Sequence, residues 1–126
     1  MKKMILLFSH KLTEEQFNDA KESLKVEEFV YLPNDLQQLW SNIPPTLKTL
    51  DKYLDSLKKF VLANSKPDDI ILIQGDFGGV YEMVNFSKKN NLIPVHSTTV
   101  RDSEEKTIDG KVTKISKFEH IIYRRY

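Results

Sequence analysis

The sequence predicts an α/β protein of Rossmann-like build, with a mostly parallel sheet flanked by helices on both faces and a β-hairpin at the carboxyl end. Short continuous apolar runs, which are typical of strands buried on both faces, alternate with segments of helical periodicity. Strands that alternate with helices favour a parallel sheet with right-handed crossovers. The chain has 126 residues, a length that fits a single domain over residues 1–126.

The first strand and the first helix are predicted from residues 4–24. The apolar run Met4–Phe8 predicts a buried strand. Thr13 begins the sequence Thr-Glu-Glu-Gln, a capping box in which the Thr13 hydroxyl and the Gln16 side chain satisfy the first free amides of a helix. Apolar residues then recur at helical spacing, at Phe17, Ala20 and Leu24.

The middle of the chain predicts a second strand and two helices. Glu28–Leu32 is typical of a strand and is closed by Pro33, and Asp35–Trp40 fits a short helix. Pro44-Pro45 marks a break and a favourable helix start. One apolar stripe follows at helical spacing, which predicts a core helix from Pro45 onward. Its members are Leu47, Leu50, Leu54, Leu57 and Val61.

The last third predicts two more buried strands, a helix and a hairpin. Ile70–Ile73 predicts the third strand, and a helix is expected over about residues 80–89. Leu92–Val95 predicts the fourth strand, shortened by Pro94, with a polar loop at residues 96–101. Asp109-Gly110 between residues 105–108 and 111–123 is a strong hairpin signal. The alternation of the last strand is imperfect, which is compatible with a β-bulge.

Composition and charge exclude several classes of function. The formal net charge is +1, so no overall field attracts DNA or a membrane, and a polyanionic ligand must be held by a local cluster. The sequence has no cysteine, which excludes disulfides, thiolate metal sites and a cysteine nucleophile. The apolar start is too short for a signal peptide, and no apolar run approaches the roughly 20 residues of a membrane helix. We therefore expect a cytoplasmic protein.

Three polar or glycine-rich segments follow predicted parallel strands, at residues 9–12, 74–79 and 96–101. Open α/β sheets bind ligands outside the carboxyl ends of their strands. We therefore expect these segments to converge at one rim of the sheet and to form the functional site.

The second segment holds three of the four glycines of the chain. Glycine permits close approach of backbone amides to a ligand, and the start of the following helix suits a phosphate. A tight turn packed against the sheet is the alternative interpretation, and Asp76 either accepts from a ribose hydroxyl or base amine or caps the helix. The spacing matches neither a dinucleotide fingerprint nor a P-loop. The ligand-binding residues expected here are Gln74, Gly75, Asp76, Phe77, Gly78 and Gly79.

The first segment carries side chains suited to proton transfer. An imidazole at His10 can act as a general base or as a nucleophile near neutral pH. Ser9 can donate to a phosphate oxygen, and Lys11 can neutralise one. The three histidines, His10, His96 and His120, lack metal-ligand spacing, and we expect no metal and no cofactor.

The third segment offers hydroxyl donors and a guanidinium. Arg101 supplies a planar fork for phosphate. We expect Ser9, His10, Lys11 and Arg101 to be catalytic, and Ser97, Thr98 and Thr99 to bind ligand. Arg124 and Arg125 would add positive charge to the same face if the final strand ran parallel to the core strands.

Five short motifs together resemble the CRISPR-associated Rossmann-fold (CARF) and ring nuclease group, small stand-alone accessory proteins of type III CRISPR systems. They span the whole chain, and their order and the chain length carry the resemblance. The motifs are Phe-Ser-His-Lys-Leu-Thr, Leu-Trp-Ser-Asn-Ile-Pro, Gln-Gly-Asp-Phe-Gly, Ser-Thr-Thr-Val-Arg and Phe-Glu-His.

The resemblance implies a cyclic oligoadenylate ligand, with the tetra-adenylate as the expected ring, held on the two-fold axis of a homodimer. It implies that the protein linearises the ring and so switches off antiviral signalling. The catalytic residues vary between branches of the group, so no exact role transfers to Ser9, His10 or Arg101. Attack of a ribose 2′-OH on the adjacent phosphorus needs only in-line positioning, which a pocket without metal can supply.

Two other functions compete with a ring nuclease. A binding-only module would sequester the cyclic nucleotide with the same donors. A phosphotransferase is the second, because Ser9-His10 and Asp76-Phe77-Gly78-Gly79 also resemble mannose-type EIIA domains, in which a histidine at this strand end is phosphorylated. Lys11 replaces the small glycine usual after that histidine, which would crowd a phosphohistidine. A purely structural or protein-binding role is a further alternative.

Overall fold

The computed structural model describes the backbone along the chain and the side chains of residues 1–101, 107, 109–112 and 118–126. Five strands form one sheet in the order β2-β1-β3-β4-β5, and β1 to β4 run parallel while β5 is antiparallel to β4. The strands are β1 (Lys3–Leu7), β2 (Glu28–Val30), β3 (Ile70–Ile73), β4 (Ile93–Ile108) and β5 (Lys111–Arg125). The helices are α1 (Glu14–Ser23), α2 (Asn34–Ser41), α3 (Asp55–Ala63) and α4 (Phe77–Lys89).

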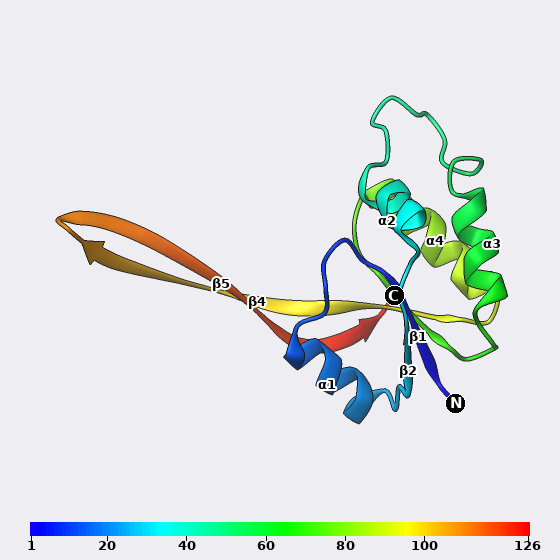
Figure 1. Ribbon diagram of the computed structural model, residues 1–126, viewed down its shortest axis with the longest axis horizontal. Coiled ribbons are helices and arrows are strands. Elements are labelled where there is room, and N and C mark those ends of the chain that lie inside the picture. The colour runs from blue at the N-terminus through cyan, green and yellow to red at the C-terminus, as the bar shows by residue number, and fades with distance from the viewer.

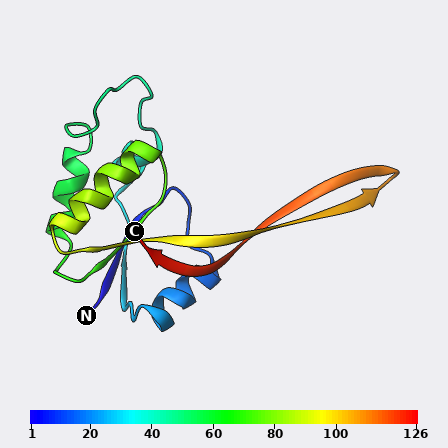
Figure 2. The ribbon, with the colours of Figure 1, turned by 180° about the vertical axis from the view of Figure 1, so that it is seen from behind.

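Helices cover both faces of the sheet, which confirms the predicted fold class. Helix α1 lies on one face, and α2, α3 and α4 lie on the other (Figures 1 and 2). Alternate residues of the central strands feed the two cores because successive side chains of a strand point to opposite faces. Ile5 and Leu7 pack with α2, α3 and α4, whereas Met4 and Leu6 pack on the α1 side.

The strand order reverses between β1 and β3. The chain passes from β1 through α1 to β2 on one side, and then crosses to β3 and β4 on the other. The loops after β1 and β3 therefore leave in opposite directions, and such a switch point opens a crevice at the carboxyl ends of the strands. This topology places residues 8–13 and 74–76 beside each other.

The start of α1 follows the predicted capping box. The Thr13 hydroxyl accepts a hydrogen bond from the Gln16 amide at 3.2 Å, and the Gln16 side-chain oxygen accepts from the Thr13 amide at 2.9 Å. Two of the free amides at the helix start are thereby satisfied. The pair also fixes the end of the loop that carries His10.

The core helix expected from Pro45 is shorter than predicted. Residues 44–54 are turns and irregular segments, with turns at residues 45–46 and 51–54, and α3 begins only at Asp55. Leu47 is 43% exposed, so it is not part of the buried stripe. The Tyr53 hydroxyl donates to the Leu39 carbonyl of α2 at 2.6 Å, and this tertiary contact holds the segment in a turn that satisfies the apolar spacing without a helix.

Two predictions at the carboxyl edge of the sheet are also wrong. Helix α4 begins at Phe77 rather than near residue 80, so Phe77, Gly78 and Gly79 form its first turn. Residues 96–101 are not a loop, because β4 continues through them to Ile108, and Pro94 does not shorten it. Pairing with β5 along this stretch gives the polar β-branched residues a strand conformation.

The hairpin prediction is confirmed at its turn and at its bulge. Asp109 and Gly110 both have positive φ, at 51° and 77°, as a two-residue type I′ turn requires. The register shifts between Ser97 and Thr99, where the Thr98 hydroxyl bonds both the amide and the carbonyl of Ile122 at 3.1 Å. Strands β4 and β5 leave the sheet together as a long ribbon beyond α1 (Figure 1).

The sequence places Arg124 and Arg125 at the site face only on the condition that the final strand runs parallel to the core strands. This condition is not met, because β5 is antiparallel to β4. Arg124 pairs with His96 and Arg125 with Val95, so β5 returns toward the sheet rather than running with it. In the part of the chain that the structure describes, no helix is both long and apolar enough to cross a membrane.

Candidate functional site

The three predicted segments meet at the switch point. The Gln74 amide donates to the Leu7 carbonyl at 3.1 Å, and the Ser97 amide donates to the Gln74 side-chain oxygen at 2.7 Å. A cavity of about 380 Å³ lies over this junction, and we call it the strand-end cavity. Its lining residues are Phe8, His10, Lys11, Thr13, Gln16, Gln74, Thr99, Phe118 and His120.

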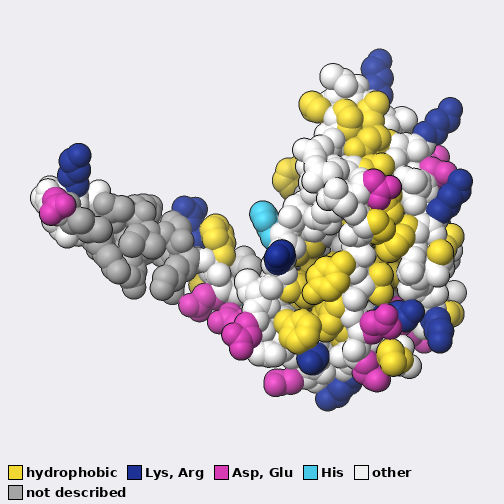
Figure 3. Space-filling view, in the orientation of Figure 1, with side chains coloured by type: hydrophobic (Ala, Val, Ile, Leu, Met, Phe, Trp, Pro, Cys, Tyr) yellow, Lys and Arg dark blue, Asp and Glu magenta, His cyan; other side chains and the backbone are white. Residues whose placement is uncertain are grey.

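The strand-end cavity lies between the body of the molecule and the β4–β5 ribbon. The space-filling view shows a hollow there, with a histidine and a basic side chain on the body side (Figure 3). Phe8 and Phe118 supply aromatic surface from opposite walls, His10 supplies a polar ring, and Lys11 also lines the cavity. This mixture of a few polar groups and apolar walls is typical of small-molecule sites.

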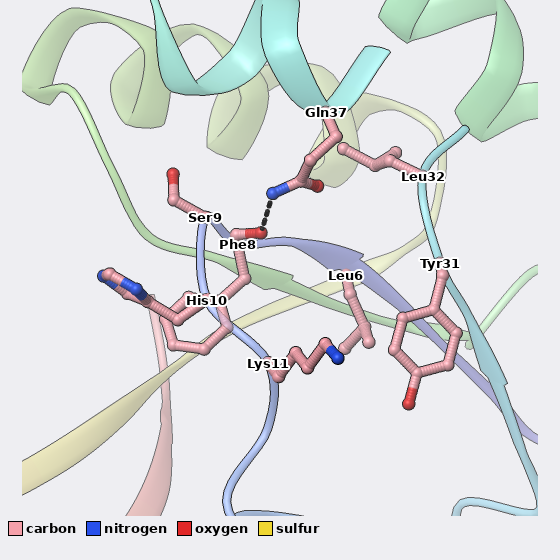
Figure 4. Close-up of a pocket in the computed structure, with 8 residues that line it drawn as sticks. All are labelled: Leu6, Phe8, Ser9, His10, Lys11, Tyr31, Leu32 and Gln37. Carbon is pink, nitrogen blue, oxygen red and sulfur yellow. Dashed lines mark hydrogen bonds between the residues drawn. The ribbon is translucent and has the colours of Figure 1, made fainter. Parts of the chain in front are cut away.

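A second hollow of about 290 Å³ opens between the ends of β1 and β2. The Lys11 side chain extends toward Tyr31, whereas the His10 ring points the other way, toward the ribbon (Figure 4). Lys11 lines both hollows. His10 and Lys11 are neighbours in sequence, but their side chains therefore lie on opposite sides of the loop.

The loop after β1 is held by two hydrogen bonds from side chains of α2. The Gln37 side-chain amide donates to the Phe8 carbonyl at 2.7 Å. The Ser41 hydroxyl donates to the Ser9 hydroxyl at 3.0 Å, which directs Ser9 toward α2 and away from His10 (Figure 4). His10 remains exposed, with its ring edge-on to Phe8 at a centroid distance of 5.5 Å.

The glycine segment is built mainly by packing against Trp40. The indole nitrogen of Trp40 donates to the Gln74 carbonyl at 3.1 Å, and a Cβ added to Gly75 would lie 3.1 Å from that nitrogen. Gly79 is buried, and a Cβ there would lie 2.7 Å from Ile43. The tight-turn interpretation therefore accounts for these two glycines.

Asp76 caps helix α4. Its carboxylate accepts from the Gly79 amide at 2.9 Å, so the amide and the helix terminus already have a negative partner. A phosphate bound at the start of α4 would be repelled by the negative charge of the Asp76 carboxylate. Of the segment 74–79, Gln74 lines the strand-end cavity, while Phe77 lies 95% exposed and lines a different cavity.

The third segment divides its side chains between two tasks. Ser97 is buried, and Thr98 bonds Ile122 at the bulge, so both stabilise the ribbon. Thr99 lines the strand-end cavity. The Arg101 guanidinium lies 5.7 Å from the centre of the Phe118 ring, within cation–π range, and Phe118 is a wall of that cavity.

One polar network beneath the cavity includes Asp19, which the sequence did not single out, and gives His120 and Ser97 partners that the sequence did not predict. His120 Nε2 lies 2.7 Å from a carboxylate oxygen of Asp19, and His120 Nδ1 lies 2.6 Å from the Ser97 hydroxyl. The Gln16 side-chain amide donates to the same hydroxyl at 3.3 Å. The network joins α1 to β4 and β5, and it fixes the ribbon wall of the cavity.

The pKa of the Asp19 carboxyl shows how the network is balanced. Burial raises this pKa, but hydrogen bonds from Ser23 and His120 outweigh the burial, so the net shift is below the ordinary value. An ionised carboxylate only accepts hydrogen bonds. Nε2 of His120 therefore carries a hydrogen and donates the hydrogen bond to Asp19. In the neutral imidazole, Nδ1 then accepts from the Ser97 hydroxyl. No local sequence pattern marks this contact, because Asp19 and His120 are 101 positions apart.

Comparison with known sequences places the chain in a family. It matches the model described as "Uncharacterized protein MJ1673 family" over residues 2–124. The chain belongs to this family. It is 55% identical to "Uncharacterized protein MJ1673" of Methanocaldococcus jannaschii, over 100% of this chain and 98% of the relative. No solved structure matches the chain.

In this member of the MJ1673 family, the helix-capping role of Asp76 predicts a measurable loss of stability. We expect Asp76→Ala to lower the free energy of unfolding by about 1 kcal/mol, because the Gly79 amide loses its side-chain acceptor. Asp76→Asn should stay close to the wild type, since asparagine caps helices equally well. Urea unfolding followed by circular dichroism measures both. Equal stability of Asp76→Ala and the wild type would contradict the capping role.

Proposed function

We propose that this chain binds a cyclic oligoadenylate, with the tetra-adenylate as the expected ring, and opens it by attack of a ribose 2′-OH without a metal. The observation that supports the proposal is the strand-end cavity. It brings the His10 imidazole, part of the Lys11 side chain, the Thr99 side chain and two phenylalanine rings to the switch point of the sheet. Aromatic rings stack on bases, and cationic groups attract phosphates.

The proposed reaction balances without a further reactant. A ribose 2′-oxygen attacks the adjacent phosphorus, the bond from phosphorus to the 5′-oxygen breaks, and the products are a 2′,3′-cyclic phosphate and a 5′-hydroxyl. His10 takes the 2′-OH proton, because its exposed ring reaches into the cavity. The 5′-oxygen receives a proton from Lys11 or from water.

Arg101, together with Lys11 once its side chain turns from Tyr31 toward the strand-end cavity, stabilises the negative charge that develops on the phosphate oxygens. Preorganised cationic groups can contribute much of the rate of such a step. The geometry argues against the Gly79 amide in this role, because that amide already donates to Asp76. Stabilisation of the phosphate charge therefore depends on side chains from the loop after β1 and from β4.

A homodimer with the ring on its two-fold axis completes the proposal. Two-fold symmetry would double a positive cluster that is small in one chain of net charge +1. Exposed apolar side chains near the base of the ribbon support association. They include Val100, Phe118, Ile121 and Ile122. In the cell, cleavage of the ring would switch off the antiviral signal that it carries.

The direct test is to incubate the purified protein with cyclic tetra-adenylate in the presence of EDTA and to separate the products by chromatography. We expect a linear product that ends in a 2′,3′-cyclic phosphate. An intact ring that co-elutes with the protein would support sequestration instead. An intact ring that does not bind would overturn the proposal.

A further inference from the structure

A third cavity, of about 350 Å³, opens on the α4 side of the same sheet edge. We call it the aromatic cleft, and its lining residues are Gln74, Gly75, Phe77, Val80, His96 and Tyr126. Two phenyl-type rings and an imidazole dominate this lining, and its side chains include no lysine or arginine. Such walls suit an uncharged planar aromatic group better than a phosphate.

The rings of the aromatic cleft are held in place. The Tyr126 amide donates to the Pro94 carbonyl at 3.1 Å, and the Tyr126 hydroxyl donates to the Ile73 carbonyl at 2.5 Å. Its ring lies 4.8 Å from the His96 ring. A ring that is already fixed loses little conformational entropy when a ligand stacks on it.

Phe77 is the exposed wall of the cleft. Its side chain is 95% accessible to solvent at the first turn of α4, although phenylalanine gains free energy when it is buried. Val80, one turn further along the helix, lines the same cleft and packs partly against the core. A planar ligand between Phe77 and Tyr126 would cover the exposed ring.

His96 gives the cleft a neutral polar edge. Burial lowers the pKa of its imidazole, and the positive charge of Arg124 lowers it further, so the ring is uncharged near neutral pH. Among the residues that the structure describes, none donates a hydrogen bond to this imidazole or accepts one from it. A neutral imidazole offers one donor and one acceptor, which match the mixed donor and acceptor edge of adenine.

We propose that the aromatic cleft is a subsite for one adenine base of the ring, and this assignment rests on the proposed function. Gln74 lines both the aromatic cleft and the strand-end cavity, so the two hollows adjoin across the end of β3. A ring nucleotide can therefore place a phosphate near His10 while an adjacent base stacks against Phe77. The cleft thereby selects adenine by stacking and by contact with His96.

The test is calorimetric titration of the 2′-deoxyribose analogue of cyclic tetra-adenylate, which cannot be cleaved, into the wild type, Phe77→Ala and Tyr81→Ala. Tyr81 is a matched control because it is also exposed, at 72%, on the next turn of α4 but does not line the cleft. We expect Phe77→Ala to weaken binding about tenfold, and Tyr81→Ala to change it less than about twofold. Equal affinity of Phe77→Ala and the wild type would overturn the subsite and leave the proposed function standing.

A wild type that binds no ring would overturn the proposed function, and the subsite is then tested separately. Adenosine 5′-monophosphate is titrated into isotope-labelled protein while amide resonances are followed. We expect shifts at Gly75, Phe77 and His96 that are lost in Phe77→Ala. If adenosine 5′-monophosphate shifts none of these resonances in the wild type, the subsite is wrong as well.

Discussion

Replacement of His10 by alanine should slow cleavage of cyclic tetra-adenylate at least about 100-fold, the usual contribution of a positioned general base. His10 is exposed and lines the strand-end cavity, and its ring points toward the ribbon (Figure 4). In the proposed reaction it takes the proton of the attacking 2′-OH. Single-turnover assays with protein in excess over labelled ring measure the effect on the chemical step.

The control for His10→Ala separates catalysis from binding. A ring with 2′-deoxyribose cannot react, so its affinity reports binding alone. We expect His10→Ala to bind this analogue within about threefold of the wild type, because the imidazole acts on the proton that is transferred. Cleavage at the wild-type rate would show that another residue is the base. Loss of affinity equal to the loss of rate would assign His10 to binding.

The fold was predictable where local pattern and tertiary packing agree. Ile70–Ile73 is a strand at the predicted bounds. Four consecutive apolar residues in a chain of alternating strands and helices are typical of a parallel strand that is buried on both faces. The Asp109-Gly110 turn follows from backbone conformations that few other dipeptides adopt. In both cases the sequence signal is the same physical preference that the structure satisfies.

The failures occur where distant contacts decide the conformation. Residues 96–101 are polar and β-branched, which is compatible with a loop or with an edge strand, and pairing with β5 selects the strand. The stripe around Leu50 and Leu54 satisfies helical spacing, yet the Tyr53 bond to α2 holds this stretch in turns. Neither of these contacts can be predicted from the local periodicity of the sequence.

The candidate site shows the same division. Its position followed from topology, because parallel strands end at one edge and the strand order reverses between β1 and β3. The individual roles of the site residues could not be predicted from topology. Ser97 supports the ribbon from a buried position, through partners that only the folded chain brings within hydrogen-bond distance. Asp76 caps a helix, which was one of the two roles expected for it, and the sequence alone did not decide between them.

The largest effect on stability is expected for His120→Ala, which should lower the free energy of unfolding by about 3 kcal/mol. The side chain of His120 is 3% exposed, and its removal takes a partner from both the Asp19 carboxylate and the Ser97 hydroxyl. Glu119→Ala is the matched control, since Glu119 is the exposed neighbour and should change stability by less than about 0.5 kcal/mol. Urea unfolding at pH 7 measures both variants.

The pH dependence of His120→Ala tests the charge of Asp19 in the same experiment. The pKa of Asp19 in the folded protein lies below its ordinary value of 3.8, so the carboxylate contributes stability that is present above that value. This contribution is lost as the pH falls through the folded pKa. Once protonated, the carboxyl group is neutral and no longer accepts a charge-assisted hydrogen bond from Nε2 of His120. The difference in stability between the wild type and His120→Ala should therefore narrow as the pH falls below 3.8 toward the folded pKa of Asp19. A difference that stays constant over this range would mean that His120 stabilises the ribbon by packing, with no part for the ionised carboxylate.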